Sequence, residues 1–324
     1  MIALLNFSMT KLAVALLVVA CGAHAQPYPN KPIRLVVPYS AGTATDLLGR
    51  LYAQKLAENL GQAVIVENKA GAGGNIAGEA VARSAPDGYT ITLSTSAVHA
   101  TNPALYGKLP FDSIRDFSHV TFLASAPNML AVNATVPAKN MAELIAYAKA
   151  NPGKLTYISA GSGTSPHMAG ELLKSMAGID ITHVPYKNIT QGFADLMGGQ
   201  VSMTFYHVPV IYPYVKDGRL RALGVATRTR SALAPEVPPI ADTVSGYEIR
   251  PWWGVSGPAG LSPDIVDRLY NATTTILNDA DTRQRFTTLG LEISLMTVKE
   301  FNDFLVAELA KWTKVVKDSG AKVD

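Results

Sequence analysis

The chain has 324 residues, of which 48 % are hydrophobic and 16 % are charged, and its formal net charge is +3 at pH 7. This composition excludes a disordered or fibrous protein, and so small a net charge does not predict binding to nucleic acid or to a membrane surface. The length exceeds the size at which a single hydrophobic core usually stops growing, so we expect a compact soluble protein of two lobes.

Residues 1–25 predict an export signal that is removed. A basic region ending at Lys11 precedes the apolar run 12–20, and an Ala-His-Ala motif ending at Ala25 supplies the small residues of a cleavage site. The apolar run is too short to cross the ~30 Å hydrocarbon core of a bilayer, so a retained transmembrane anchor is not expected. We therefore expect the mature protein to be released into the periplasm.

Cys21 leaves a second processing route open. It ends the segment Val-Val-Ala-Cys, which resembles a lipoprotein box in which the cysteine would be lipidated and become the first residue. Ordinary cleavage after Ala25 fits the sequence better, because the folded pattern begins soon after that site. Cys21 is the only cysteine, so ordinary cleavage leaves no residue for a disulfide, a thiolate metal site or a cysteine nucleophile.

Beyond the signal, apolar strand-like runs alternate with helical periods, which is typical of an α/β fold with largely parallel sheets. The first part of the chain contains two consecutive strand–helix–strand units. We expect strands at 33–37, 63–67 and 90–94, and helices at 45–59 and 75–83.

After Phe117 the pattern starts again and predicts a second lobe of the same class. Strands at 119–126 and 129–133 flank a break at Pro127, and Asn140 with Glu143 forms a capping box for the next helix. We expect that helix at 141–150, further helices at 166–177 and 192–197, and strands at 155–159, 182–184 and 201–205.

The last part of the chain returns to the first lobe through a Pro-rich stretch at 235–239 and a strand at 249–255. Two helices follow, and each begins with a recognisable N-terminal signal. Ser262-Pro263 opens a helix to about residue 277, and the capping box of Thr297 and Glu300 opens a terminal helix to about residue 317.

A chain that crosses out of one lobe and back again forms a clamshell. We place the first lobe at 26–126 and 246–324, and the second at 127–245. Ligand sites in such sheets lie where loops leave the carboxyl ends of the strands and helices begin.

Two loops with these features are candidates for an anion site. PYSAGTATD (38–46) follows the first strand, and SAGSGTSPH (159–167) has the same arrangement in the second lobe. Small residues let the backbone approach a ligand, and a helix start presents unpaired N–H groups and a partial positive charge suited to a carboxylate. An ordinary turn capped by Thr45 or Asp46 explains the first loop equally well.

The second loop is not a catalytic serine motif. Ser162 lacks the Gly-x-Ser-x-Gly frame, because position 160 is Ala. Ser162 and Thr164 instead offer hydroxyl donors beside the start of a helix. We therefore favour a second anion-facing helix start over a nucleophile.

Other motifs have ordinary structural explanations. GAGG at 71–74 lacks the third glycine that a dinucleotide turn would have at position 76. Two aromatic pairs lie near the expected cleft, Tyr206-His207 and Trp252-Trp253. Either core packing or the lining of a pocket would explain these rings. The five histidines beyond the signal show no metal-ligand spacing of three or four residues: His99, His119, His167, His183 and His207.

Seven segments, which follow one another in order from Tyr28 almost to the end of the chain, match a known pattern. They are YPNKPIRLVVPYSAGTATD, VENKAGAGGNIAGEAVARSAPDGYT, ELIAYAKANPGKLTY, HVPYK, DLMGGQV, KDGRLRALGVAT and LAKWTKVVKDSG. In these segments the chain resembles the Bug family, the periplasmic solute receptors of tripartite tricarboxylate transporters. The resemblance implies a periplasmic binding protein of the Venus flytrap type II fold, with two lobes joined by crossing strands. It also implies an organic acid in the cleft, its carboxylate held mainly by backbone N–H groups, Ser or Thr hydroxyls and water.

Carried onto this chain, the resemblance implies ligand contacts in both loops, after the third strand and along the rim of the second lobe. The implied residues are Tyr39, Ser40, Ala41, Thr43, Thr45, Asp46, Ser94, Thr95, Ser96, Ala160, Gly161, Ser162, Gly163, Thr164, His167, Pro185, Tyr186, Phe205 and Tyr206. The chain departs from the family pattern at Thr43 and Asn188, where glycine is common, and at Tyr206-His207, where an acidic or amide residue frequently follows the aromatic. These departures leave the carboxylate grip in place but prevent transfer of any relative's substrate.

The function expected from the sequence is a non-enzymatic receptor. It would bind a small carboxylate between its lobes and deliver it to the membrane subunits of a tripartite tricarboxylate transporter. We expect a monomer that needs no cofactor or metal and binds no nucleic acid. The alternative is an orphan sensor that presents its liganded form to a signalling partner, and an enzyme ranks third, because no paired acid/base constellation can be placed.

Overall fold

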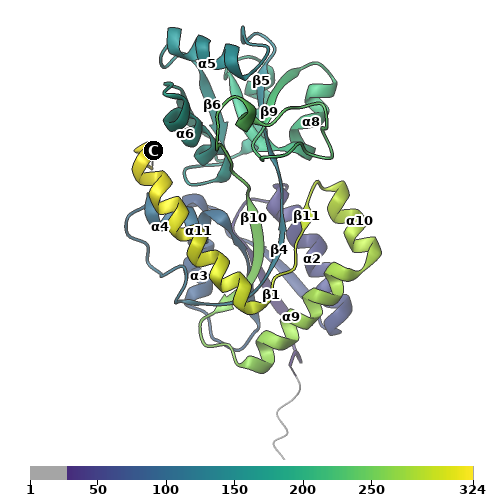
Figure 1. Cartoon of the computed structure of the whole chain (residues 1–324). Helices are drawn as coiled ribbons and strands as arrows, with labels where there is room; N and C mark the ends of the chain where they lie inside the picture. Colours follow the sequence, from purple (N-terminus) through teal and green to yellow (C-terminus); the bar gives the residue numbers. More distant parts are fainter. Residues whose placement is uncertain (1–27, 324) are drawn as a thin grey trace, which may run out of the picture.

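The computed structural model describes residues 28–323, so the expected export signal and Cys21 lie outside the described residues. A six-stranded and a five-stranded sheet form two lobes, one above the other (Figure 1). The predicted two-lobed α/β fold is confirmed. Both sheets are mixed rather than largely parallel, because each contains strands that arrive from the other lobe.

The first lobe is built on a sheet of order β11-β4-β10-β3-β1-β2. β1 pairs in parallel with β2 and with β3, as two strand–helix–strand units require. β10 runs antiparallel to β3 and β4, because it re-enters the sheet from the second lobe. The strands are β1 (Ile33–Val37), β2 (Val64–Asn68), β3 (Thr90–Thr95), β4 (Phe117–Ser125), β10 (Trp252–Pro258) and β11 (Glu292–Ile293).

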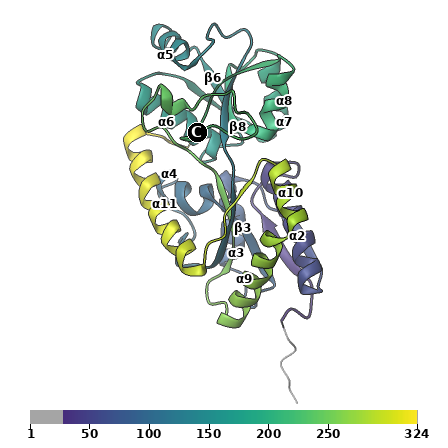
Figure 2. The ribbon, with the colours of Figure 1, turned by 45° about the vertical axis from the view of Figure 1, so that its right-hand side comes forward.

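Helices cover both faces of this sheet. Leu48 and Tyr52 of α2 pack with Leu269 of α9 against one face, while α3 and α11 cover the other. Figure 2 shows α11 on one side of the lobe and the α9–α10 pair on the other. The helical segments of this lobe are α2 (Ala44–Leu60), η1 (Ala72–Gly74), α3 (Asn75–Ala82), η2 (Ala97–Thr101), α4 (Asn102–Leu105), α9 (Pro263–Asn278), α10 (Ala280–Thr288) and α11 (Val298–Ser319).

The second lobe has a sheet of order β7-β6-β8-β5-β9. Ile189 and Phe193 of α7 and Ile211 of α8 pack on one face, and Met168 and Leu173 of α6 pack on the other. Its elements are β5 (Asn128–Asn133), α5 (Met141–Ala150), β6 (Thr156–Ser159), α6 (Ser165–Ala177), β7 (Thr182–Pro185), α7 (Ile189–Met197), β8 (Met203–His207), α8 (Val208–Lys216), β9 (Leu220–Val225) and η3 (Ile240–Asp242).

Two segments cross between the lobes side by side. β4 passes directly into β5, and the return segment leads into β10. Where they meet, the Ala126 N–H donates to Pro251 O at 3.1 Å. On the second-lobe side, the Ile249 N–H of the return segment donates to Ala226 O, just after β9, at 2.9 Å. Such a paired crossing allows the lobes to move relative to each other about a narrow hinge.

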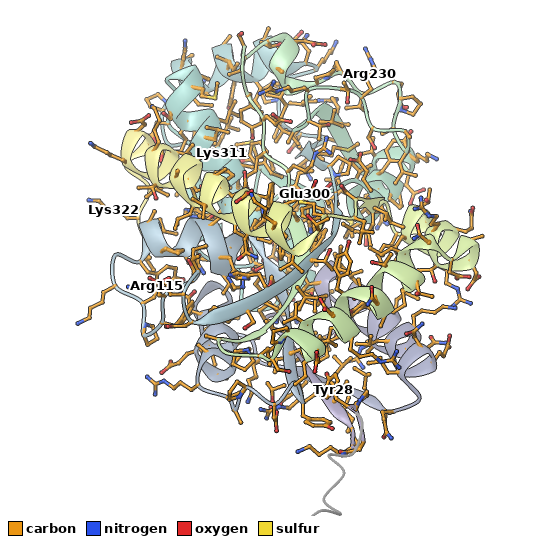
Figure 3. All side chains as sticks on the ribbon, turned by 60° about the horizontal axis from the view of Figure 1, so that its bottom comes forward. Tyr28, Arg115, Arg230, Glu300, Lys311 and Lys322 are labelled. Atoms are coloured by element: carbon orange, nitrogen blue, oxygen red, sulfur yellow. The ribbon has the colours of Figure 1, made fainter. Side chains whose placement is uncertain are left out.

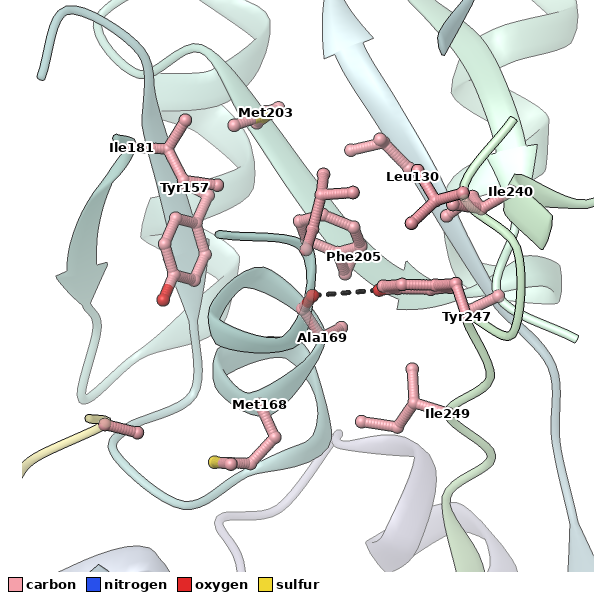
Figure 4. Close-up of a cluster of buried hydrophobic side chains, with 14 of the residues drawn as sticks. Leu130, Tyr157, Met168, Ala169, Ile181, Met203, Phe205, Ile240, Tyr247 and Ile249 are labelled. Carbon is pink, nitrogen blue, oxygen red and sulfur yellow. Dashed lines mark hydrogen bonds between the residues drawn. The ribbon is translucent and has the colours of Figure 1, made fainter. Parts of the chain in front are cut away.

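One hydrophobic cluster extends from the first lobe into the second. Phe122 and Trp252 join Tyr157 and Phe205 in it, and α11 contributes Phe301. Figure 4 shows the part of it around α6 and β8, where the buried Tyr247 hydroxyl donates to Ala169 O at 2.8 Å. The long α11 thus packs against residues that belong to both lobes and lies across the hinge (Figure 1).

Glu308 of α11 fixes this helix to a crossing strand. Its Oε2 accepts a hydrogen bond from Trp252 Nε1 at 3.0 Å and another from Trp312 Nε1 at 3.1 Å. A carboxylate with two indole donors is a rigid, charge-assisted junction in a largely apolar setting. Figure 3 shows that other charged side chains, such as Arg115, Arg230 and Lys322, lie at the periphery of the molecule.

Several elements were not predicted from the sequence, and α8 is the most informative. Pro213 lies inside the helix and argues against it, because proline removes a backbone donor, whereas the proline in the first turn is tolerated. The helix forms because Val208 and Ile211 are buried against the second sheet. η2, α4, α10, η3 and the strands β9 and β11 were missed as well. α10 is largely polar, and β11 has only two residues.

Candidate functional site: a cavity between the lobes

A cavity of about 470 Å³, a volume that includes space open to solvent, lies between the two lobes and against the crossing strands. Three groups of residues line it. From the first lobe come Tyr39, Thr43, Ala44, Thr45, Thr95 and Ser96; from the second come Ala160, Thr164, Ser165, Pro166, Tyr206 and His207; and from β10 and the residue before it come Pro251, Trp252 and Trp253.

The first wall is the start of α2. Thr43 is the N-cap residue, with its side chain accepting from the Asp46 N–H at 3.3 Å. The next two residues, Ala44 and Thr45, line the cavity. Their N–H groups belong to the first turn, which has no intrahelical acceptor. This helix of 17 residues therefore directs its positive end into the cavity.

Thr45 also offers a side-chain donor. Its Oγ1 accepts a hydrogen bond from Trp253 Nε1 at 2.9 Å, in a buried setting. With the oxygen already accepting, the hydroxyl hydrogen is left for an acceptor in the cavity. The contact joins residues 208 positions apart in the sequence. It fixes the orientation of both side chains at the cavity wall.

Asp46 serves the loop and not the cavity. Its Oδ2 accepts from the Gly42 N–H at 2.9 Å and from Arg50 Nε at 3.0 Å, and its Oδ1 accepts from Asn68 Nδ2 at 2.9 Å. Burial acts to raise the pKa of Asp46, but these donors outweigh it and hold that pKa below its ordinary value. The carboxylate is thus ionised and fully occupied in shaping the turn.

The opposite wall is the start of α6. Thr164 is its N-cap residue and donates its hydroxyl to Gly161 O at 2.6 Å. Ser165 follows, and its Oγ accepts from Asn128 Nδ2 at 2.9 Å, which again leaves a hydroxyl hydrogen to donate. The turn needs glycine at position 163, whose φ of +83° an L side chain rarely adopts. Two helix N-termini, one from each lobe, therefore meet at one cavity.

The lobes touch each other beside this cavity. The Tyr106 hydroxyl of the first lobe donates to Ser162 O of the second at 3.4 Å. Gly73 of the first lobe packs so closely that an added Cβ would lie 2.6 Å from the same carbonyl oxygen. Gly163 leaves no room for a Cβ next to Asn102. The structure is therefore that of a closed cleft.

The cavity is electrically neutral apart from its helix ends. Among residues 28–323, those that line it include no Asp, Glu, Lys or Arg. Burial lowers the pKa of His207 to about 4, so its ring is uncharged at neutral pH. Burial also raises the pKa of Tyr39 to about 12, against a hydrogen bond with Thr95, and raises the pKa of Tyr206 well above its ordinary value. Both phenols stay protonated and can donate hydrogen bonds.

Aromatic rings form a continuous wall on the hinge side. The Tyr206 and His207 ring centroids lie 4.9 Å apart, and the His207 and Trp253 centroids lie 5.5 Å apart. Phe193 packs edge-on against Tyr206 at 4.9 Å from behind. The His207 Nδ1 is enclosed and has no hydrogen-bond partner within the part of the chain that the structure describes.

Eight of the residues expected from the sequence line this cavity. They are Tyr39, Thr43, Thr45, Thr95, Ser96, Ala160, Thr164 and Tyr206. The structure thus brings together side chains that the resemblance assigned to four separate segments. Whether they contact a ligand stays a prediction.

The other expected residues lie outside the cavity lining. Ser94 is turned to Ser256, at 2.5 Å between the two Oγ atoms. Tyr186 donates to Asp195 Oδ2 at 2.7 Å. Phe205 alternates with Tyr206 along β8 and points into the core shared by the lobes. The rest of this group comprises Asp46, Ser40, Ala41, Gly161, Ser162, Gly163, His167 and Pro185. Those that lie in the two loops shape the helix starts instead of lining the cavity.

The resemblance did not assign several lining residues. Pro166 directly follows the assigned second loop, while Ala44 and Ser165 lie within the two assigned loops without having been singled out as contacts. His207 and Trp253 belong to the aromatic pairs for which the sequence left two interpretations open, and both line the cavity. Pro251 had no sequence signal, because its place depends on where the return segment crosses.

Comparisons with known proteins agree with this geometry. A family model described as "Tripartite tricarboxylate transporter family receptor" matches residues 48–321. Protein BugT of Bordetella pertussis is 32 % identical over 309 residues, which cover 94 % of this chain and 94 % of that protein. The structure of R. palustris Rpa4515 with adipate has a TM-score of 0.86 and 35 % identity, covering 91 % of this chain and 99 % of that one. The structure of MatC from Rhodopseudomonas palustris with bound malate has a TM-score of 0.82 and 29 % identity, covering 89 % of this chain and 100 % of that one.

Proposed function

This chain belongs to the family of tripartite tricarboxylate transporter receptors, and we propose that it captures a small carboxylate in the cavity between its lobes. Family members are periplasmic solute receptors and not enzymes. We propose further that this protein works in the periplasm as a monomer and delivers its ligand to the membrane subunits of a tripartite tricarboxylate transporter.

The convergence of two helix N-termini on one neutral cavity carries this proposal. Each N-terminus is equivalent to roughly half a positive charge, and its N–H donors have no intrahelical partner and can bind a ligand in place of water. Thr45 and Ser165 add hydroxyl donors from opposite lobes. A carboxylate placed between them would receive donors from both lobes and so favour the closed form. Two relatives of similar fold were solved with carboxylates, one with adipate and one with malate.

The mechanism follows from where the donors lie. In an open form the carboxylate can bind the start of α2, whose donors belong to the first lobe alone. Closure then brings the start of α6 onto the same anion and places Ser162 against Tyr106 and Gly73. When the lobes separate, the donors of α6 withdraw and only those at the start of α2 remain, so the ligand is held more weakly and can leave. The sequence-based lobe limits, 26–126 with 246–324 and 127–245, remain our proposal for the two moving bodies.

Purification without denaturation, followed by native mass spectrometry, tests the proposal directly. We expect a retained small acid, or, in the emptied protein, a rise in melting temperature with at least one member of a broad carboxylate panel. A ligand at a hundred times its Kd should stabilise the protein by about 2.7 kcal/mol. Folded protein that retains nothing and responds to no carboxylate would contradict the proposal.

The sensor alternative differs only in the partner of the liganded form. Pull-down with reconstituted membrane subunits, with and without ligand, separates the two. Ligand-dependent binding to those subunits supports delivery, and its absence favours signalling.

A further inference from the structure

We infer that Glu308 of α11 is a positioning residue for ligand binding. It holds the start of β10 in place and, through that strand, the Thr45 hydroxyl that faces the cavity. This inference rests on the proposed function, and it deepens that function by naming a residue outside the cavity lining that controls affinity within it.

Glu308 stands where the packing of α11 predicts an apolar residue. Buried positions on the inner face of this helix recur every three or four residues, and they are filled by Phe301, Leu305, Trp312 and Val316. Glu308 fills the position between Leu305 and Trp312, and its side chain is only 12 % exposed. An amphipathic helix would place an apolar residue there, and burial of a carboxylate is unfavourable unless donors meet it. Its partners explain why a carboxylate stands at this position.

Two indole groups supply the donors. Glu308 Oε2 accepts from Trp252 Nε1 at 3.0 Å and from Trp312 Nε1 at 3.1 Å, and Lys311 Nζ lies 3.4 Å from the other oxygen. An indole has a single N–H, so each ring takes the direction of its hydrogen bond from this carboxylate. Trp252 is the first residue of β10 and lines the cavity. Glu308 thus fixes a residue of the cavity wall from outside the cavity.

The next residue of β10 extends this connection to the start of α2. Successive side chains of a strand point to opposite faces, so Trp252 packs in the cluster that includes part of α11, whereas Trp253 packs in the cluster that includes part of α2. Trp253 Nε1 donates to Thr45 Oγ1 at 2.9 Å. β10 is paired with β3 on one side and with β4 on the other, so the two tryptophans do not shift independently. A series of contacts therefore leads from α11 to the Thr45 hydroxyl.

α11 is a suitable anchor for this series because it is held on both sides of the hinge. It packs against β4 of the first lobe and against α6 of the second, and Figure 1 shows its C-terminal end beside α6. Trp312 and Val316 belong to the same hydrophobic cluster as Met168 and Leu173 of α6. The Glu308 junction can therefore keep the crossing strand in one position while it supports Thr45.

The tryptophans make a direct test possible. The chain has three, Trp252, Trp253 and Trp312, and each gives an indole N–H signal in a proton–nitrogen correlation spectrum, assigned with single Trp-to-Phe variants. Glu308→Gln keeps the shape and an acceptor oxygen but removes the charge. Glu308→Leu removes both oxygens and suits the apolar face of the helix, so we expect it to fold. In both variants of the emptied protein the Trp253 signal should move, although Trp253 donates to Thr45 and not to Glu308, and it should move further in Glu308→Leu.

Asp303→Asn is the matched control. Asp303 lies on the same helix, and its side chain is 66 % exposed and pairs with Lys299 at the surface. Its replacement removes the same charge from α11 at a site remote from the junction, so the Trp253 signal should keep its wild-type position. A Trp253 signal that stays in place in Glu308→Leu, or that moves equally in Asp303→Asn, would overturn the inference.

Calorimetric titration with adipate and with malate measures the effect on binding. Glu308→Leu should weaken binding of the acid that the wild type binds by about two- to thirtyfold, Glu308→Gln by less, and Asp303→Asn by less than about twofold. In a Thr45→Val background the further loss from Glu308→Leu should shrink to about twofold or less, because its effect passes through that hydroxyl. Losses that simply add in the double variant would contradict this route.

Two outcomes separate this inference from the proposed function. If an acid binds and Glu308→Leu leaves its Kd unchanged, the inference fails and carboxylate capture stands. If neither acid nor any other member of a broad carboxylate panel binds to the folded protein, the proposed function fails, and the Trp253 signal still decides whether Glu308 positions Thr45.

Discussion

Replacing Gly73 with alanine should oppose closure of the cleft. Gly73 has a φ of +62°, and an added Cβ would lie 2.6 Å from the backbone oxygen of Ser162 in the other lobe. Real Cβ atoms essentially never come so close to a neighbour, and a backbone oxygen cannot swing aside as the end of a side chain can. The lobes must therefore separate slightly to relieve the overlap.

Two free-energy costs have to be distinguished. A left-handed backbone at alanine costs about 1–2 kcal/mol in the open and the closed form alike, so it lowers stability without changing affinity. The overlap with Ser162 arises only in the closed form. Overpacking of this kind typically costs about 1–3 kcal/mol. Because the ligand binds the closed form, its apparent Kd should rise about 5- to 150-fold.

Gly107→Ala is the matched control. Gly107 also lies in the first lobe, its φ is +69°, and no atom lies within 4 Å of an added Cβ. Both variants should melt at a similarly lowered temperature, by about 2–8 °C. Calorimetric titration with the same carboxylate should then give a raised Kd for Gly73→Ala alone. Equal Kd values for the two variants would refute the idea that closure across Gly73 and Ser162 is coupled to binding.

Three further predictions concern the site and its scaffold. Thr45→Val keeps the side-chain shape but removes the hydroxyl that donates to the ligand and accepts from the Trp253 indole. Carboxylate affinity should therefore fall about tenfold in calorimetric titration. An unchanged Kd would exclude this hydroxyl from the site. Burial lowers the pKa of His99 to about 4, so the unfolded chain takes up this proton from about pH 6.5 downwards and the folded one does not. His99 alone should therefore contribute a loss of about 3 kcal/mol in stability between pH 6.5 and pH 4, beside the losses from His119 and His207, whose pKa burial also lowers. In urea titrations His99→Phe should lose less stability than the wild type over that interval, and an equal loss would contradict the assignment. Thr297→Ala removes the capping box with Glu300 at the start of α11. This variant should lower the free energy of unfolding by about 1 kcal/mol without altering the Kd of the ligand. A changed Kd would mean that this helix start also affects closure.

Much of the fold could be predicted because local signals agreed with the global pattern. Asn140 with Glu143, Ser262 with Pro263, and Thr297 each open a helix where the sequence places one. These caps depend on residues within a single turn, so they are visible in sequence. α8 was missed for the opposite reason. Its interior Pro213 argues locally against a helix, and only burial of its apolar side against the second sheet decides for one.

The parts of the site that lie in the two loops could be predicted from the sequence. The parts that depend on where the chain crosses back between the lobes could not. Both small-residue loops end at helix starts, as the sequence pattern indicates, but the N-cap of the first helix is Thr43 and not Thr45 or Asp46, and that of the second is Thr164. The aromatic wall required knowledge that β10 of one sheet brings Trp253 against His207 at the end of β8 in the other. Trp253 meets Thr45 across 208 residues, and no local signal encodes that contact. Phe205 and Tyr206 are neighbours on a strand buried on both faces, so alternation alone could not show which one lines the cavity.

The central claim is that a carboxylate group is held between the starts of α2 and α6 without a cationic side chain. Calorimetric titration of the emptied protein with its best acid and with the primary amide of that acid tests it most directly. The amide matches the acid in shape and lacks only the charge. We predict that the acid binds at least tenfold more tightly than the amide and that Thr45→Val removes most of this difference. Equal affinity for acid and amide would contradict the account.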